Sequence, residues 1–248
     1  MHKTVLIFDW DDTLMDVGKY LCNSQYDACQ AILQQQSKYP FTRYWPKPSM
    51  TTLETYVGHR FAETIIPGIF TEFDINNPQH KLWQQNLMKL FLQNYRAQPK
   101  QLFPEITAML TNLKQQSYPL TIATNKSRHL LMSDFEAAGL NHTMFDLLVC
   151  GDDATLEGKF KPHPNMINII QNNFNNAPSF IMIGDRESDM AAAKHSEKQQ
   201  LTKTIAIAAA DNDFNADYTT NTAANITSAV IEDLAQSGES PREGCRSS

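Results

Sequence analysis

The chain is poor in cysteine and has no excess of positive charge. Its 248 residues carry a net charge of −6 and four cysteines, which form neither a CxxC motif nor a Cys/His metal pattern: Cys22, Cys29, Cys150 and Cys245. Free thiols in a reducing compartment are the simplest account of such cysteines, so we expect a cytoplasmic protein. Proteins that bind nucleic acids usually carry a basic surface, and the charge therefore argues against a nucleic-acid partner.

Long hydrophobic runs are also absent. No apolar stretch approaches the roughly 20 residues that a helix needs to cross a bilayer, which argues against a membrane protein. The first residues contain one lysine, a brief apolar run and three acids, and this is not the pattern of a signal peptide. A length of 248 residues is enough for one large or two modest domains with a proper core.

The most informative stretch that is present covers residues 5–14. Four apolar residues, 5–8, are followed at once by Asp9, Trp10 and Asp11. Such a run predicts a strand of a parallel sheet that is buried on both faces. Ligand sites lie beyond the carboxyl ends of such strands, so Asp9 and Asp11 are expected to enter a crevice, with Trp10 pointing the other way. A pair of acids there suits a hard cation and a phosphate; a plain acidic turn is the alternative.

Three later stretches extend this pattern. Residues 120–127 form an apolar run that ends at Thr124, and residues 158–164 form a proline-stiffened loop that contains Lys161. Residues 180–189 form another apolar run, ending in Gly-Asp with a further acid four residues on. This order resembles the haloacid dehalogenase superfamily, whose four motifs are DxD, Ser/Thr, Lys and an acidic pair. The resemblance covers most of residues 4–230, and the TNK and KPxP motifs look most like the phosphoglycolate phosphatase branch.

The resemblance implies a Mg²⁺-dependent phosphatase that hydrolyses a small phosphomonoester, such as 2-phosphoglycolate, through an aspartyl-phosphate. Asp9 would be the nucleophile, and Asp11 would protonate the leaving oxygen and later activate water. Thr124, Asn125 and Lys161 would bind the phosphoryl group, with Lys161 also supplying positive charge to the nucleophile.

The same resemblance implies a set of metal ligands. These would be Asp9, the backbone carbonyl of Asp11, Asp185 and Asp189, of which the last would act directly, through a bound water or through Lys161. Mg²⁺ fits because it is a hard ion that takes oxygen ligands.

Single residues in these motifs leave alternatives open. A threonine at a strand end is commonly structural, and a lysine in a polar loop is usually solvated. Lys159 competes with Lys161, although only Lys161 directly precedes Pro-His-Pro. Lys126 either steers anions towards the site or is a plain surface lysine. Asp12 stands where the family often has glycine, and we expect its side chain to satisfy backbone donors in the turn.

Helical and alternating patterns divide the rest of the chain. Residues 16–98 read as helical, with a stripe expected in the core: Leu82, Leu87, Leu90, Phe91 and Tyr95. After Pro104, helices alternate with strands, which are predicted at 119–124, 145–149, 179–184 and 203–208. We therefore predict an α/β fold, a Rossmann-like parallel sheet sandwiched by helices. Residues 1–15 and 99–236 would form this core, 16–98 an inserted all-helical cap, and 237–248 a disordered tail.

The cap is expected to choose the substrate. His59 and Arg60 interrupt the helical pattern and are candidate contacts to a carboxylate or hydroxyl of the substrate, or else solvated loop residues. Relatives with a cap occur as monomers and homodimers, and both states stay open. Two other functions also stay open, a sugar phosphomutase of the same superfamily and a non-catalytic binding protein on the same scaffold. A dehalogenase fits less well, because carbon–halogen displacement has no need of Asp11 as an acid.

Overall fold

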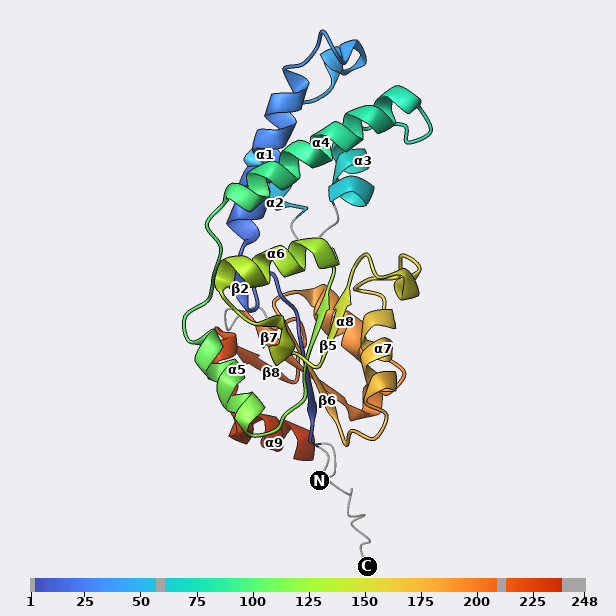
Figure 1. Ribbon diagram of the computed structural model, residues 1–248. Coiled ribbons are helices and arrows are strands. Elements are labelled where there is room, and N and C mark those ends of the chain that lie inside the picture. The colour runs from blue at the N-terminus through green and yellow to red at the C-terminus, as the bar shows by residue number, and fades with distance from the viewer. Residues whose placement is uncertain (1–2, 57–60, 209–212, 238–248) are drawn as a thin grey trace, which may run out of the picture. The chain divides into compact units, whose positions relative to one another are not determined.

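The computed structural model describes residues 3–56, 61–208 and 213–237 (Figure 1). The chain divides into two compact units. The core unit comprises Met1–Met15 and Leu102–Ser248, and the helical unit comprises Asp16–Gln101. Two short strands, β2 (Met15–Asp16) and β3 (Gln101–Leu102), pair with each other where the chain passes between the units. The predicted disordered tail lies, apart from Ser237, outside the described residues.

The core unit contains a six-stranded parallel sheet. The strand order is β5-β4-β1-β6-β7-β8, with bounds Leu147–Cys150, Leu120–Thr124, Val5–Phe8, Phe180–Gly184, Thr202–Ile207 and Tyr218–Thr220. Every pairing is parallel. The predicted α/β sheet is therefore confirmed, and the four later strands predicted begin and end within two residues of those observed. Strand β8 was missed because its residues, Tyr-Thr-Thr, include no apolar run.

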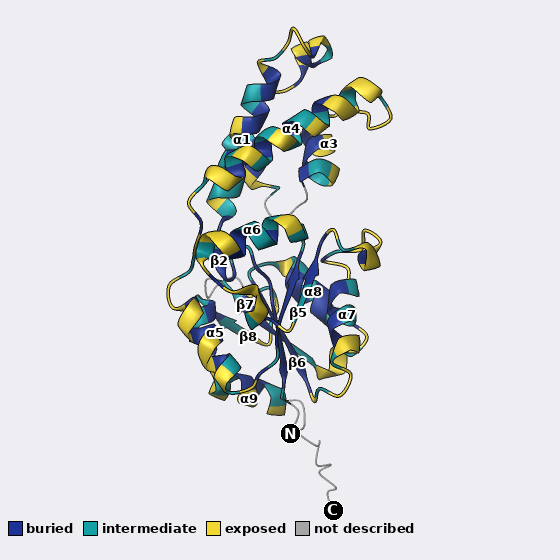
Figure 2. Cartoon of the chain, in the orientation of Figure 1, coloured by how far each residue is buried: buried dark blue, intermediate teal, exposed yellow. Residues whose placement is uncertain are grey.

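Helices cover the sheet on both faces (Figure 1). They are α5 (Ile106–Gln115), α6 (Arg128–Ala138), α7 (Asn165–Asn173), α8 (Glu187–Lys194) and α9 (Ser228–Gln236). Val5 and Ile7 of β1 lie in one buried cluster with Met166 of α7 and Ala192 of α8. Trp10, just past β1, packs against α6. The central strands β1, β4 and β6 are dark blue, that is buried, in Figure 2, as expected for a parallel sheet covered on both sides.

Single helical turns connect some of these elements. They lie at His142–Met144, Ala154–Leu156, Gln199–Leu201 and Ala223–Asn225. No helix in the described part of the chain is long and apolar enough to cross a membrane.

The helical unit is built on two long helices. Helix α1 (Gly18–Leu33) packs against α4 (Pro78–Ala97). Shorter pieces accompany them: a 3-10 turn at Pro40–Tyr44, α2 (Met50–Glu54), a π turn at Phe61–Ile65 and α3 (Ile66–Ile69). In α4 the predicted stripe is partly wrong, because Leu82 is 51% exposed whereas the neighbouring Trp83 is fully buried. Trp83 packs edge-on against Trp45 and Phe70, and these bulky aromatic rings set which side of α4 faces inwards.

Candidate active site

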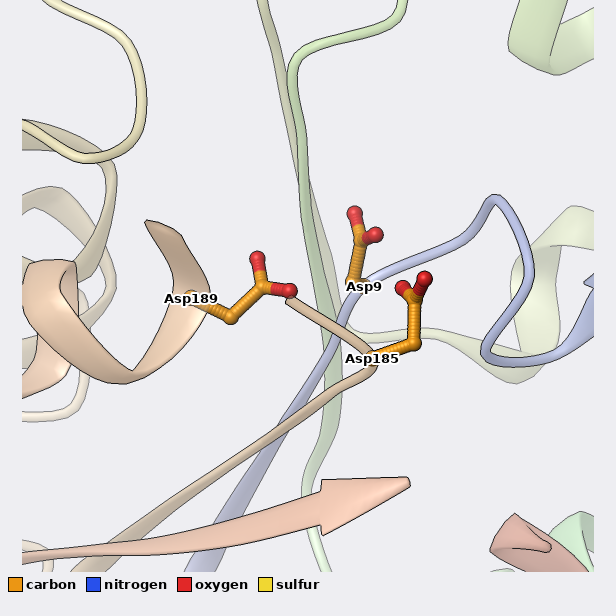
Figure 3. A group of neighbouring side chains, drawn as sticks. All are labelled: Asp9, Asp185 and Asp189. Atoms are coloured by element: carbon orange, nitrogen blue, oxygen red, sulfur yellow. The ribbon is translucent and has the colours of Figure 1, made fainter. Parts of the chain in front are cut away.

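Three carboxyl groups converge at the carboxyl ends of the central strands. Asp9 follows β1, Asp185 follows β6, and Asp189 lies in the first turn of α8. One oxygen from each lies within 4.8 Å of the others, and Figure 3 shows the three side chains turned towards a common space. The backbone N–H of Asp9 donates to the carbonyl of Ile183 at 2.8 Å, so the parallel register itself places Asp9 beside Asp185. Three of the predicted metal ligands, Asp9, Asp185 and Asp189, therefore have their carboxylates close together.

Asp189 reaches this site because Gly184 has no side chain. A Cβ atom at position 184 would overlap the carboxylate of Asp189. The backbone N–H of Arg186 also donates to Asp189 Oδ2 at 3.1 Å, which fixes the carboxylate at the beginning of α8. A side chain at position 184 would thus have to displace Asp189.

Lys161 joins two of the acids. Its Nζ lies 2.7 Å from Asp9 Oδ1 and 2.5 Å from Asp189 Oδ1, and the side chain is 2% exposed. Burial alone lowers the pKa of Lys161, but the charges of Asp189 and Asp9 outweigh it and raise the pKa above its usual value. Lys159 instead points to solvent, with its side chain 53% exposed and Nζ 3.6 Å from Glu157. Of the two competing lysines, only Lys161 lies in the site.

Uncompensated negative charge remains in the cluster. Burial, followed by the charges of Asp9 and Asp189, raises the pKa of Asp185 to about 8. Burial also raises the pKa of Asp189 to about 6, although Lys161 opposes this shift. When all three acids are ionised, they exceed the single charge of Lys161 by two negative charges, and the neighbouring Arg186 is shared with a fourth acid, Asp12. An oxygen-rich site with that excess fits a hard divalent cation.

Two further side chains hold Asp185. Thr13 Oγ1 donates to Asp185 Oδ1 at 3.0 Å, and Arg186 Nε lies 3.5 Å from Asp185 Oδ2. Arg186 also reaches the carboxylate of Asp12, at 3.4 Å. The sequence analysis did not single out Thr13 or Arg186 as site residues, since their relation to Asp185 depends on how the first motif folds against the end of β6.

Asp11 takes a different direction from Asp9. Its carboxylate is not part of the three-acid cluster; Oδ1 instead contacts the ammonium of Lys126, which also contacts Asp134 in α6. Burial raises the pKa of Asp11 to about 6, and Lys126 opposes that rise. Lys126 is 8% exposed, so the alternative of a plain surface lysine is wrong, and a role in steering anions stays a prediction. A role for the Asp11 backbone carbonyl as a metal ligand stays a prediction.

The second predicted motif begins at Thr124, the last residue of β4, and continues with Asn125. Thr124 is buried, and its Oγ1 accepts a hydrogen bond from the backbone N–H of Lys126 at 3.2 Å. Asn125 Nδ2 donates to the backbone carbonyl of Lys161 at 2.9 Å and so ties this loop to the lysine loop. Their predicted contacts with a phosphate stay predictions. The two candidates from the helical part, His59 and Arg60, lie outside the described residues.

A family comparison agrees with this arrangement. Residues 6–202 match the model of the haloacid dehalogenase-like hydrolase family. The chain belongs to this family. The matched range contains all four motifs, and the resemblance predicted from them is confirmed.

Individual relatives point to one branch of the family. A phosphoglycolate phosphatase from Colwellia psychrerythraea is 28% identical over 197 residues, which cover 78% of this chain and 80% of that protein. A phosphoglycolate phosphatase from Vibrio cholerae is 25% identical over 195 residues, covering 77% and 80% respectively. Among solved structures, a β-phosphoglucomutase from Clostridium difficile has a TM-score of 0.68 at 13% identity, covering 95% of this chain and 98% of its own. This last similarity concerns the fold alone.

Proposed function

We propose that the chain is a Mg²⁺-dependent phosphatase that hydrolyses a small phosphomonoester through an aspartyl-phosphate on Asp9. The main support is the placement of Lys161, whose ammonium touches Asp9 inside a cluster of three acids. Such a pair places positive charge beside the nucleophile, where a phosphoryl group would arrive. The curated relatives are phosphoglycolate phosphatases, so 2-phosphoglycolate is the first substrate to test.

The metal would be held by Asp9, Asp185 and Asp189, with Thr13 fixing the orientation of Asp185. When bound there, Mg²⁺ would reduce the repulsion between a phosphate dianion and a carboxylate. The chemistry of the donors fits this ion, because all three side chains offer hard oxygen ligands.

The reaction on the protein side has two steps. In the first, a carboxylate oxygen of Asp9 forms a bond to phosphorus while the ester P–O bond breaks, and the carboxyl of Asp11 gives its proton to the departing oxygen. In the second, Asp11 takes a proton from a water molecule that attacks the aspartyl-phosphate, which releases inorganic phosphate and regenerates Asp9. The Thr124 hydroxyl and nearby backbone N–H groups would hold the phosphoryl oxygens during both steps.

We also propose that the helical unit, Asp16–Gln101, serves as the cap. A cap excludes bulk water while the intermediate exists and opens to release product. His59 and Arg60 remain its candidate substrate contacts. Variants of these two residues should change KM for the preferred substrate more than for p-nitrophenyl phosphate.

The first test is phosphate release from p-nitrophenyl phosphate with Mg²⁺ or with EDTA. Asp9→Asn should abolish turnover, and EDTA should abolish it in the wild type. Asp146→Asn is the matched control, because Asp146 pairs with Lys114 on the surface and should leave the rate unchanged. Equal rates for the wild type and Asp9→Asn would exclude the mechanism. A panel of phosphorylated metabolites then identifies the substrate.

A sugar phosphomutase uses the same aspartyl-phosphate, and the shared fold with a β-phosphoglucomutase keeps this alternative open. Product analysis with glucose 1-phosphate separates the two activities. A mutase makes the 6-phosphate and little free phosphate, whereas the proposed phosphatase releases inorganic phosphate.

A further inference from the structure

A series of buried polar contacts, here called the positioning chain, links Asp11 to helix α6 and does not include the three-acid cluster. The indole Nε1 of Trp10 donates to Asp134 Oδ2 at 3.2 Å, and the same oxygen accepts from Lys126 Nζ. Lys126 Nζ in turn contacts Oδ1 of Asp11. Trp10 and Asp134 have no exposed surface, and Lys126 is 8% exposed. The chain therefore connects the interior of helix α6 to one oxygen of Asp11.

Three separate segments have to pack together to build this chain. Trp10 follows β1 and points away from Asp9, so that its ring packs on Phe135 of α6 with centroids 4.7 Å apart. Lys126 lies in the connection between β4 and α6, and Asp134 lies one residue before Phe135. Burying such charges costs several kcal/mol per ion unless their partners are well placed, so apolar residues would fill this space at lower cost.

The two oxygens of Asp11 lie in different surroundings. Oδ1 is buried against Lys126, yet the Asp11 side chain as a whole is 26% exposed. The exposed part therefore excludes Oδ1, which leaves Oδ2 as the carboxyl oxygen that could meet an incoming ester. An ammonium held on one oxygen fixes the rotation of the whole carboxyl group, because both oxygens lie in one plane with Cγ.

We propose that Asp134 is a positioning residue for the acid–base step: it holds Lys126, and Lys126 fixes Asp11 so that Oδ2 transfers the proton. This inference rests on the proposed function. When the ester P–O bond breaks and the bond from Asp9 to phosphorus forms, the proton on Oδ2 passes to the leaving oxygen. Asp134 also balances the charge of Lys126, so that the buried cation orients Asp11 without adding a net positive charge beside it.

If Asp134 positions the acid, the loss of rate in a variant should depend on the leaving group of the ester. A basic leaving oxygen needs the proton from Asp11, whereas dinitrophenolate departs unaided. Loss of the positioning chain should therefore slow the hydrolysis of phenyl phosphate and spare that of 2,4-dinitrophenyl phosphate. A purely structural role for Asp134 would slow both esters by the same factor. The three phenyl esters, with 4-nitrophenyl phosphate between the extremes, differ little in shape.

The experiment measures kcat/KM for these three esters with Mg²⁺, because this constant reports the step in which the leaving group departs. Asp134→Asn and Lys126→Met should lose about 10- to 100-fold on phenyl phosphate and less than about threefold on 2,4-dinitrophenyl phosphate. Lys126→Met provides a second route if Asp134→Asn does not fold. Asp11→Asn shows the full effect of losing the acid and should give the steepest dependence.

Asp153→Asn is the matched control. Asp153 pairs with Arg128 Nη2 at 2.8 Å in the same unit and has the same kind of carboxylate–cation contact. Its loss should change all three esters equally. An equal loss across the series in Asp134→Asn or Lys126→Met would overturn the inference while leaving the phosphatase intact. A wild type without metal-dependent turnover of any ester would instead overturn the proposed function, and the inference with it.

Discussion

Replacing Lys161 with methionine removes the ammonium that touches both Asp9 and Asp189 and leaves a side chain of similar length. The lysine side chain is 2% exposed, and those of Asp9 and Asp189 are 10% and 1% exposed. Removing one partner of a buried ion pair costs about 3–5 kcal/mol, because the remaining charges stay buried without compensation. For a chain of this size, we therefore expect the melting temperature to fall by about 6–20 °C.

The size of this loss should depend on pH. Lys161 has a folded pKa above its unfolded value, so its contribution is fully present below the unfolded pKa and is lost only at strongly alkaline pH. Without Lys161, which opposes the rise, the folded pKa of Asp189 should lie further above its unfolded value. The folded variant then binds protons that the unfolded chain does not, and its stability rises as the pH falls, by about 1.4 kcal/mol per pH unit for each proton.

Urea denaturation in EDTA at pH 8.0 and pH 5.5 measures this dependence. The cost of Lys161→Met should be largest at pH 8.0, smaller at pH 5.5, and partly reversed at pH 8.0 by Mg²⁺. Lys159→Met is the control, and it should cost less than about 0.5 kcal/mol, because Lys159 is exposed. A cost that is the same at both pH values and unaffected by Mg²⁺ would refute the view that Lys161 compensates a buried acid cluster.

Three further outcomes are expected. Gly184→Ala should displace Asp189 and lower metal affinity at least about tenfold, as measured by the shift of the melting temperature with Mg²⁺; an unchanged shift would contradict the close approach at this glycine. Because the pKa of Asp185 is raised to about 8, apo stability should fall as the pH rises from about 5 to 8, and Mg²⁺ should stabilise more at pH 8.5 than at pH 6. The difference in Mg²⁺ stabilisation between pH 8.5 and pH 6 should disappear in Asp185→Asn. Asn125→Ala frees the backbone carbonyl of Lys161 and should cost about 1 kcal/mol in urea denaturation, with a lower kcat for p-nitrophenyl phosphate; wild-type values for both would show that this tether is unimportant.

Sequence alone was enough for the parallel sheet and for the meeting of Asp9 with Asp185. A strand buried on both faces must be apolar throughout, and this pattern is visible in residues 5–8 and 180–183. In a parallel sheet, neighbouring strands end at the same edge, so acids that follow two such strands come together. Strand β8 was missed for the same reason, since its short polar sequence carries no such pattern.

Tertiary packing decided the remaining features. Lys159 and Lys161 share one polar loop. The Pro-His-Pro that follows Lys161 favoured this lysine, but its contact with Asp9 depends on how the loop folds. Lys126 is buried because α6 carries Asp134 to it, a contact across eight residues and a helix start that no local pattern specifies. In α4, Trp83 and not the predicted Leu82 is buried on the inner face, because Trp83 packs among other large aromatic rings. Local sequence patterns indicate which residues are buried. The partner of each buried charge, in contrast, depends on how the segments pack against one another.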